Sequence, residues 1–399
     1  MLAILVATAA VLGERGPASW PFSCNANQSA QDIVAGLRIP GQVVVVTGAD
    51  GDGGRAVVMA AATAGATVVL CGRNATRINA TIKSTLAVVP AAKLDVSIFD
   101  LADLRSTRLA AQRLLAAYPT ISALVNNAGG MSMAGKLTAD SYDEMFEVQN
   151  LAPALLTDVL IPALIRGRGR VVNVASSAAY DPLPSKHLAA DMLGFARDKP
   201  ALSGPVGYGV SKRLVIHYTA ELHTRMNGSI SAIAVNPGYF RTPPFSLADK
   251  LACATVMKFH PCPQSPEQGA SVVTFAALVP GAEAASGRLL DFETSIGALG
   301  LWSQTGENCV PRTLPKWDAA EVAKWYDAVQ LVIRAEKERA GHPDDCPGSC
   351  STGCGGSCIC HGCQPFYCIS RSSPEYKASQ NEQKLRAVIR AATGITVTN

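Results

Sequence analysis

A tyrosine and a lysine placed one helical turn apart are the side chains best suited to proton transfer in this sequence. The segment Tyr208-Gly209-Val210-Ser211-Lys212 puts the phenol and the ammonium on one face if it is helical. A phenol has a reference pKa of about 10, and a nearby cation lowers that pKa because it stabilises the phenolate. The pair therefore suits general acid–base chemistry, with Tyr208 taking a proton from an alcohol or giving one to a carbonyl.

A serine hydroxyl stands upstream of this pair, at the end of an apolar run. Residues 170–175 are followed by Ser176 and Ser177, and we take Ser176 as the first candidate to hydrogen bond with a substrate oxygen. Either serine could instead make only local hydrogen bonds to the backbone. A tyrosine four residues before a lysine also occurs by chance on solvated helices, so the chemistry needs support from the surrounding segments.

A glycine-rich loop that could hold a dinucleotide follows the first apolar run, residues 43–47. The loop is formed by Thr47, Gly48, Ala49, Asp50, Gly51, Asp52, Gly53 and Gly54. Residues 55–64 then have helical spacing, so strand, glycine turn and helix come in the order that binds pyrophosphate at a helix N-terminus. An ordinary strand-to-helix turn has the same pattern when taken alone.

The residues after the second apolar run, 67–71, indicate which dinucleotide would bind. Rossmann proteins that prefer NAD usually place a carboxylate at this point to accept the ribose hydroxyls. This chain has Gly72 and Arg73 there instead, and an arginine guanidinium is a planar, permanently charged partner for a 2′-phosphate. The sequence therefore predicts NADP(H) as cofactor, against the alternative of a solvated arginine at a strand end.

Together these segments resemble the short-chain dehydrogenase/reductase family, whose opening motif is Thr-Gly-x-x-x-Gly-x-Gly. Asp52 stands where that motif has its middle glycine, and we expect its carboxylate to cap the following helix instead of facing the phosphates. The other matches to the family occur in chain order. They are Asp100 and Leu101; Asn126, Asn127, Ala128 and Gly129; Ser176, Tyr208 and Lys212; and Asn236, Pro237, Gly238 and Thr242.

The resemblance implies a role for each matched segment. The Asp-Leu pair would contact adenine, the Asn-Asn-Ala-Gly motif would brace the sheet beside the cofactor ribose, and the Pro-Gly segment with Thr242 would support the nicotinamide and its carboxamide. Ser176, Tyr208 and Lys212 would be catalytic, and the last two would also touch the cofactor. The implied reaction moves a hydride between NADP(H) and a small-molecule carbonyl or alcohol substrate.

One catalytic position departs from the family. Its fourth catalytic residue is an asparagine that holds a water between the lysine and solvent, and this asparagine aligns with Gln149. Because glutamine is longer by one methylene, either Gln149 reaches that water differently or Asn150 replaces it after a small adjustment of the helix. We expect proton relay here to be slower than with asparagine but not lost.

Three further segments narrow the resemblance to part of the family. Residues 181–205 lengthen the connection between the catalytic serine and tyrosine, and together with residues 29–36 and 265–270 they resemble the retinol-dehydrogenase-like and WW-domain-oxidoreductase-like branches. Substrates there are often bulky and apolar, such as retinoid-, steroid- or lipid-like molecules, and residues 239–262 are apolar enough to help line such a pocket. The alternative is a catalytically weak NADP(H)-binding sensor or interaction protein that uses a cysteine-rich tail.

Short apolar runs that alternate with longer helical segments predict an α/β fold, a doubly wound parallel sheet of the Rossmann type with a C-terminal helix and a small cysteine-rich tail. The expected strands are residues 43–47, 67–71, 92–95, 123–126, 170–175, 231–235 and 287–290. An amphipathic helix is expected at 315–339. The residues near its apolar face are Trp317, Val322, Trp325, Val329 and Val332.

Composition agrees with a packed globular protein that acts on small molecules. Of 399 residues, 48% are hydrophobic and 17% are charged, which is far from the composition of disordered chains. The net charge of +4 is small and the basic residues form no stripe, so no nucleic-acid partner is expected. Two long helices, before Arg166 and after Tyr208, are candidates to pair in a homodimer, as in the family.

The division into parts follows the changes in composition. We expect an apolar N-terminus at 1–24, the Rossmann domain at 25–314, the helix within 315–341 and the cysteine-rich module and tail at 342–399. The first dozen residues are too short to span a bilayer as a normal helix, so a cleaved signal peptide and a loosely ordered or membrane-associated terminus both fit.

The cysteine-rich tail also leaves alternatives open. Seven cysteines lie between Cys346 and Cys368. Disulfides, with the odd cysteine pairing elsewhere, for example with Cys24, fit a secreted chain, whereas zinc or redox use fits a cytoplasmic one. An unstructured tail is the third alternative, and no metal ligands are assigned. Localisation, either secretory and membrane-associated or cytoplasmic, therefore stays open.

Overall fold

Runs of β-branched residues form the central sheet, and both of its faces are covered. In the computed structural model of the chain, β1 (Val43–Thr47) directs Val44 and Val46 to one side of the sheet and Val45 to the other, and all three are fully buried. Strands that are apolar on both faces are typical of a parallel sheet between two helical layers. The pattern that predicted this strand therefore reflects its burial on both sides.

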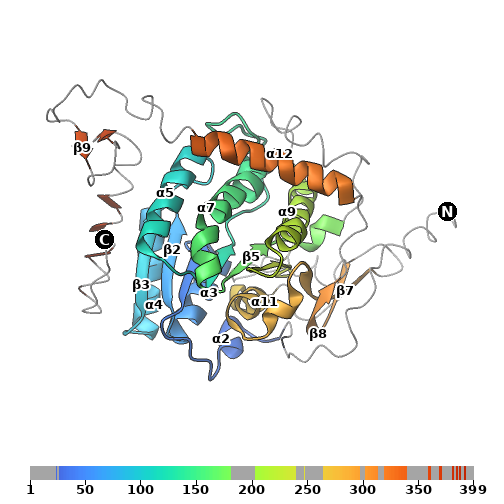
Figure 1. Cartoon of the computed structure of the whole chain (residues 1–399). Coiled ribbons are helices and arrows are strands. Elements are labelled where there is room, and N and C mark those ends of the chain that lie inside the picture. Colours follow the sequence, from blue (N-terminus) through green and yellow to red (C-terminus); the bar gives the residue numbers. More distant parts are fainter. Residues whose placement is uncertain are drawn as a thin grey trace.

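The sheet runs in the order β3-β2-β1-β4-β5-β6-β7-β8 (Figure 1). The other strands are β2 (Thr67–Gly72), β3 (Lys93–Ile98), β4 (Ala123–Asn126), β5 (Arg170–Val174), β6 (Ser231–Val235), β7 (Leu289–Ile296) and β8 (Trp302–Arg312). Strands β1 to β7 are parallel to their neighbours, and β8 pairs antiparallel with β7. This confirms the predicted Rossmann fold and its seven strands, to which β8 adds an edge strand that was not predicted.

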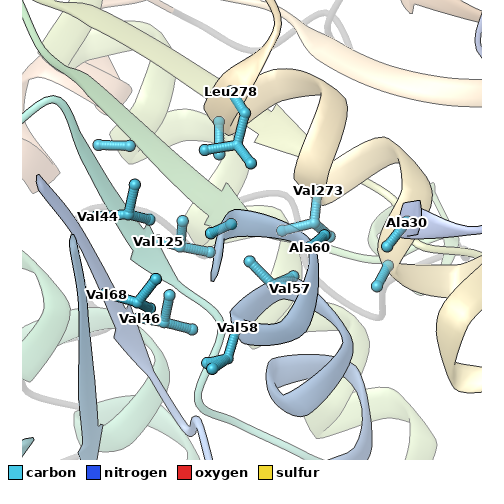
Figure 2. Packing of buried hydrophobic residues seen from close by; sticks show 14 of the residues in the cluster. Ala30, Val44, Val46, Val57, Val58, Ala60, Val68, Val125, Val273 and Leu278 are labelled. Atoms are coloured by element: carbon cyan, nitrogen blue, oxygen red, sulfur yellow. The ribbon is translucent and has the colours of Figure 1, made fainter. Parts of the chain in front are cut away.

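Helices form a layer on each face of the sheet. The longer ones are α3 (Asp52–Thr63), α4 (Ala75–Val88), α5 (Leu104–Ala117), α7 (Ala152–Arg166), α9 (Gly204–Met226), α11 (Pro266–Leu278) and α12 (Ala319–Glu338), and α2 (Ala30–Ile33) is one turn. Helices α2, α3, α4 and α11 share one core cluster with the sheet, and α5, α7, α9 and α12 share the other. Figure 2 shows the first cluster, in which Val57 of α3 and Val273 of α11 lie over Val44, Val46 and Val125.

The C-terminal helix α12 crosses α5, α7 and α9 (Figure 1). Its buried side chains include Trp325 and Val329, which belong to the predicted apolar face, and also Tyr326. The Tyr326 ring stacks on Tyr218 of α9 with 5.5 Å between the ring centroids. Helix α12 therefore covers part of the α7 and α9 surfaces that we expected to pair in a homodimer, whereas Trp317 lies outside the described residues.

One described segment is long and apolar enough to cross a membrane. It is Glu144–Arg166, and 72% of its most apolar window is buried inside the fold. The segment consists of α6 (Glu144–Phe146), a π-helical turn η2 (Glu147–Leu151) and α7. Its burial between the sheet and α5, α9 and α12 is the environment of a core helix.

The structure describes residues 24, 27–180, 203–239, 247, 264–296, 302–312, 319–338, 358–360, 368–370, 380–381, 383–384, 386–387 and 391. The predicted signal or anchor, most of the 181–205 extension, most of the 239–262 segment and most of the cysteine tail lie outside these residues. Within the tail, β9 (Cys358–Cys360) and β10 (Cys368–Ser370) pair antiparallel. Buried Cys24 is disulfide-bonded, and Arg386 bonds Asp95 of β3 at 2.7 Å.

Candidate active site

The carboxyl ends of the parallel strands bring the predicted segments to one edge of the sheet. The glycine loop follows β1, Arg73 follows β2, Asp100 follows β3, Asn127 follows β4 and Ser176 follows β5. Strands β1 and β4 are neighbours, and the chain runs outward from this pair in opposite directions. Doubly wound sheets bind their ligands at such a switch point.

The glycine loop is a tight turn that requires glycine at positions 48 and 54. A Cβ at Gly54 would lie 2.2 Å from the carbonyl oxygen of Gly48, and one at Gly48 would lie 2.9 Å from Cα of Ala128. Gly51 is the N-cap of α3 and no side chain caps this helix. The expectation that Asp52 caps it is therefore wrong, because Asp52 is the first residue inside the helix, where its exposed carboxylate is favourable to the helix dipole.

Hydrogen bonds tie the glycine loop to the Asn-Asn-Ala-Gly motif. The Thr47 hydroxyl accepts the backbone N–H groups of Asn127 and Ala128 at 3.0 and 3.1 Å. The Asn127 amide donates to the carbonyl oxygens of Thr47 and Gly48 at 2.9 and 3.3 Å. The ends of β1 and β4 thus form one rigid unit beside the turn.

A second amide network crosslinks the interior behind this unit. Asn126 donates to Asn173 of β5 at 2.8 Å, and Asn173 donates to Thr219 of α9 at 2.9 Å. All three side chains are buried. Because buried polar groups are costly unless they are paired, this chain of bonds fixes β4, β5 and α9 relative to one another.

The predicted serine, tyrosine and lysine are brought together at the ends of β5 and α9. The Ser176 side chain lies beside the phenol of Tyr208, close enough to lower the pKa of the phenol, and its oxygen accepts the N–H of Ala178 at 3.2 Å. The Nζ of Lys212 lies 5.6 Å from the centroid of the Tyr208 ring. Ser177, the second serine candidate, instead begins the 3₁₀ turn η3 (Ser177–Tyr180).

Burial shifts the pKa values of both Tyr208 and Lys212. Desolvation raises the pKa of Tyr208, and the hydrogen bond with Ser176 lowers it. Desolvation lowers the pKa of Lys212 from 10.5 to about 7, while its ammonium donates to the carbonyl oxygen of Val174 at 2.7 Å. The phenol is therefore held in its protonated form, ready to give a proton, next to an amine that titrates near neutral pH.

The lowered pKa of Lys212 predicts a pH-dependent stability. Its folded pKa of about 7 lies below the ordinary 10.5, so the unfolded chain binds more protons between these values and the fold gains stability as pH rises through them. We expect the difference in unfolding free energy between Lys212→Met and the wild type to favour the variant most below pH 7 and to decline toward pH 10. Urea denaturation at several pH values measures this, and a difference that stays constant between pH 6 and pH 10 would contradict the prediction.

The amides of the π-helical turn donate hydrogen bonds to groups other than the lysine. Gln149 donates from Nε2 to the carbonyl oxygen of Gly130 at 3.1 Å, and its Oε1 would lie 3.0 Å from a Cβ at Gly129. Asn150 donates to the hydroxyl of Ser211 at 3.0 Å. In the described part of the chain, neither side chain hydrogen bonds to Lys212, so Gln149 braces the loop after β4 in this structure.

Replacement of Gln149 by the shorter asparagine tests the relay directly. We expect Gln149→Asn to raise kcat by a few-fold, because asparagine is the residue found in the family and a longer side chain slows proton relay. Steady-state turnover measures the effect, with Asn150→Gln on the same turn as the comparison. An unchanged or lower kcat for Gln149→Asn would count against a relay at this position.

Two arginines flank the end of β2, and only one of them was predicted. Arg73 lies 3.6 Å from the carboxylate of Asp100, and both side chains are largely exposed. Arg77 donates from Nη2 to the carbonyl oxygen of Asp50 at 2.9 Å, and its Nε lies 3.6 Å from the Asp50 carboxylate. The spacing of four residues from Arg73 into the following helix was the signal that could have identified Arg77.

A buried carboxylate that sequence reasoning missed supports the segment after β6. Asn236 donates to Asp291 of β7 at 2.8 Å, and the N–H of Gly238 donates to Asn236 at 3.2 Å. Gly238 has a φ of 74°, which favours glycine. Pro237 is buried in this turn, whereas Thr242 lies outside the described residues.

The residues present fit a dinucleotide. The glycine turn leaves the N-terminus of α3 without a side-chain cap, and two guanidinium groups stand at the end of β2. Asp100 accepts the N–H of Ala102 at 3.0 Å, and buried Leu101 follows it at the expected adenine end. Backbone N–H groups, arginines and a carboxylate are the groups that recognise pyrophosphate and ribose.

Comparisons with known proteins agree with this fold. The family model described as short chain dehydrogenase matches residues 42–188. Retinol dehydrogenase 12 of Mus musculus is 32% identical over 254 residues, which cover 63% of this chain and 78% of that protein. The WW domain-containing oxidoreductase of Danio rerio is 26% identical over 334 residues, which cover 81% of this chain and 75% of that protein.

A comparison with a solved structure supports the fold, and the fold alone. The gluconate 5-dehydrogenase of Burkholderia cenocepacia J2315, in complex with NADP and tartrate, matches with a TM-score of 0.51 at 20% identity, covering 64% of this chain and 94% of that one. The fold is that of a doubly wound α/β protein of the Rossmann type. With the family model and relatives above, the chain belongs to the short-chain dehydrogenase/reductase family, in its retinol-dehydrogenase-like branch.

Proposed function

We propose that the chain transfers a hydride between NADP(H) and a carbonyl or alcohol substrate, with Tyr208 as general acid and base. The observation that carries the proposal is the placement of Lys212 Nζ 5.6 Å from the centroid of the Tyr208 ring, with Ser176 close enough to the phenol to lower its pKa. These groups lie at the same sheet edge as the glycine turn. A substrate oxygen could therefore meet a hydroxyl donor and an acid at once.

The three side chains divide the work on the substrate oxygen. In reduction, the bound cofactor supplies a hydride to the carbonyl carbon. Ser176 donates a hydrogen bond to the carbonyl oxygen, and Tyr208 gives its proton to that oxygen as negative charge develops on it. Lys212, in its ammonium form, favours the phenolate that remains. In oxidation, the phenolate takes the alcohol proton back.

The preference for NADP(H) is supported by the end of β2. Gly72 leaves no carboxylate at that position, and Arg73 and Arg77 place two guanidinium groups around it. Because the pair between Arg73 and Asp100 is exposed, solvent screens it and it holds the arginine only weakly. Arg73 is therefore available for a 2′-phosphate.

Several finer predictions belong to the same proposal. A bulky, apolar substrate of retinoid, steroid or lipid type is supported by the branch of the family. Membrane association through the N-terminus and a homodimer stay predictions, and α12 contacts both α7 and α9, the two helices expected to pair in that homodimer. The division into parts at residues 24, 314 and 341 also stays a prediction.

The proposal is tested by NADPH oxidation in the presence of a panel of aldehydes and ketones that includes long apolar ones. We expect carbonyl-dependent oxidation with one alcohol formed per NADPH consumed, and loss of that activity in Tyr208→Phe. The alternative, a sensor or interaction protein, is favoured by the departures at Asp52 and Gln149. It predicts NADPH binding with no turnover that depends on Tyr208, which would overturn the enzymatic proposal.

A further inference from the structure

The carboxylate that is missing from the end of β2 is supplied by the glycine loop. A Cβ built on Gly72 would lie 2.9 Å from Oδ1 of Asp50 and 3.4 Å from its Cγ. The Asp50 carboxylate therefore lies along the direction that a side chain at position 72 would take. Its side chain is only 14% exposed, because it lies against Gly72 of β2 and Arg77 of α4.

The loop around Asp50 is anchored on both sides. The N–H of Ala49 donates to the carbonyl oxygen of Cys71 at 3.1 Å, and the Thr81 hydroxyl donates to the carbonyl oxygen of Ala49 at 3.2 Å. Arg77 bonds the backbone oxygen of Asp50 and lies 3.6 Å from its carboxylate. Asp50 thus has a fixed position between the end of β2 and the guanidinium of Arg77.

This position puts two opposed groups where the adenosine ribose is expected. A carboxylate at the end of β2 accepts ribose hydroxyls and repels a 2′-phosphate. An arginine attracts the phosphate, but Arg77 is already partly neutralised by Asp50. A 2′-phosphate would have to take Arg77 from Asp50 and approach that carboxylate, whereas a free 2′-hydroxyl could donate a hydrogen bond to it.

We propose that Asp50 is a specificity-determining residue that holds the preference for NADP(H) over NAD(H) to a modest value. It accepts the ribose hydroxyls of NAD(H) and competes with the 2′-phosphate of NADP(H) for Arg77. This inference rests on the proposed function, because it assigns a nicotinamide dinucleotide to the site. Removal of the charge at Asp50 then sharpens the selection for the phosphorylated cofactor.

The test uses two fragments that differ only in the 2′-phosphate. Calorimetric titration of the full chain with 2′,5′-ADP and with 5′-AMP gives a ratio of affinities that needs no turnover. We expect Asp50→Asn to raise the ratio in favour of 2′,5′-ADP by at least about tenfold, or about 1.4 kcal/mol. Asp52→Asn removes the same charge from the same loop and should move both affinities together, which leaves the ratio within about threefold.

Arg77→Gln provides a second measurement should Asp50→Asn fold poorly. We expect it to weaken 2′,5′-ADP by about tenfold while 5′-AMP changes by less than about threefold, since only the phosphate needs the guanidinium. Either an unchanged ratio in a folded Asp50→Asn chain or an unchanged affinity of Arg77→Gln for 2′,5′-ADP overturns the inference.

Turnover and fragment binding together distinguish an error about Asp50 from an error about the cofactor site as a whole. Wild-type turnover of NADPH together with a ratio that Asp50→Asn leaves unchanged overturns only the role of Asp50. A wild-type chain that binds neither fragment at millimolar concentration overturns both, because the site would then not hold an adenine nucleotide.

Discussion

Tyr208→Phe is expected to lower kcat/KM for carbonyl reduction by about 10²- to 10⁴-fold, the range that a positioned general acid contributes. The phenol is the group that can give a proton to the substrate oxygen, and the Ser176 hydroxyl that it contacts would remain as a hydrogen-bond donor only. Affinity for NADPH should change by less than about tenfold, because at most one hydrogen bond to the cofactor is lost. Stopped-flow and equilibrium titration measure the two quantities separately.

The matched control is Tyr218→Phe. It deletes the same hydroxyl from the same helix, but Tyr218 lies further along α9 and is buried against Tyr326 and Trp325 of α12. We expect its kcat/KM to stay within a few-fold of the wild type, with some loss of thermal stability. Equal losses of activity in both variants would show that the effect of Tyr208→Phe is structural.

Glu336→Ala is expected to cost about 3–5 kcal/mol of unfolding free energy, the usual effect of removing one partner of a buried ion pair. Glu336 of α12 accepts from Nε of Arg108 at 3.1 Å, and the two side chains are 4% and 0% exposed. Without the carboxylate, the guanidinium of Arg108 keeps its charge in the contact between α5 and α12. Urea denaturation followed by tryptophan fluorescence measures the loss of unfolding free energy.

A surface pair on the same helix turn is the control for this prediction. Lys337 lies 2.6 Å from Asp158 of α7, and its side chain is 45% exposed. Lys337→Ala should cost less than about 1 kcal/mol, because solvent screens exposed ion pairs. Similar losses of unfolding free energy in Glu336→Ala and Lys337→Ala would contradict the prediction, because burial of the ion pair would then make no difference to the cost of breaking it.

Prediction from sequence was strongest where local pattern and burial agree. Strand β1, with four consecutive valines, lies between two apolar layers, so its residues had to be apolar on both faces. Strand β8 was missed because residues 302–312 contain Gly, Asn and Pro and few β-branched residues. Such a segment can join a sheet only at its edge. Strand β8 does so by pairing with β7, and the composition of residues 302–312 does not reveal this pairing.

The sequence by itself determined the order of the seven parallel strands, the glycine turn and the helical face shared by Tyr208 and Lys212, because each depends on spacing within a few residues. The tertiary structure decided which distant side chains meet. Asp50 reaches the end of β2, Glu336 reaches Arg108 and Asp291 reaches Asn236. Such contacts join segments separated in the chain, and their energies depend on burial and distance, which only the folded chain defines.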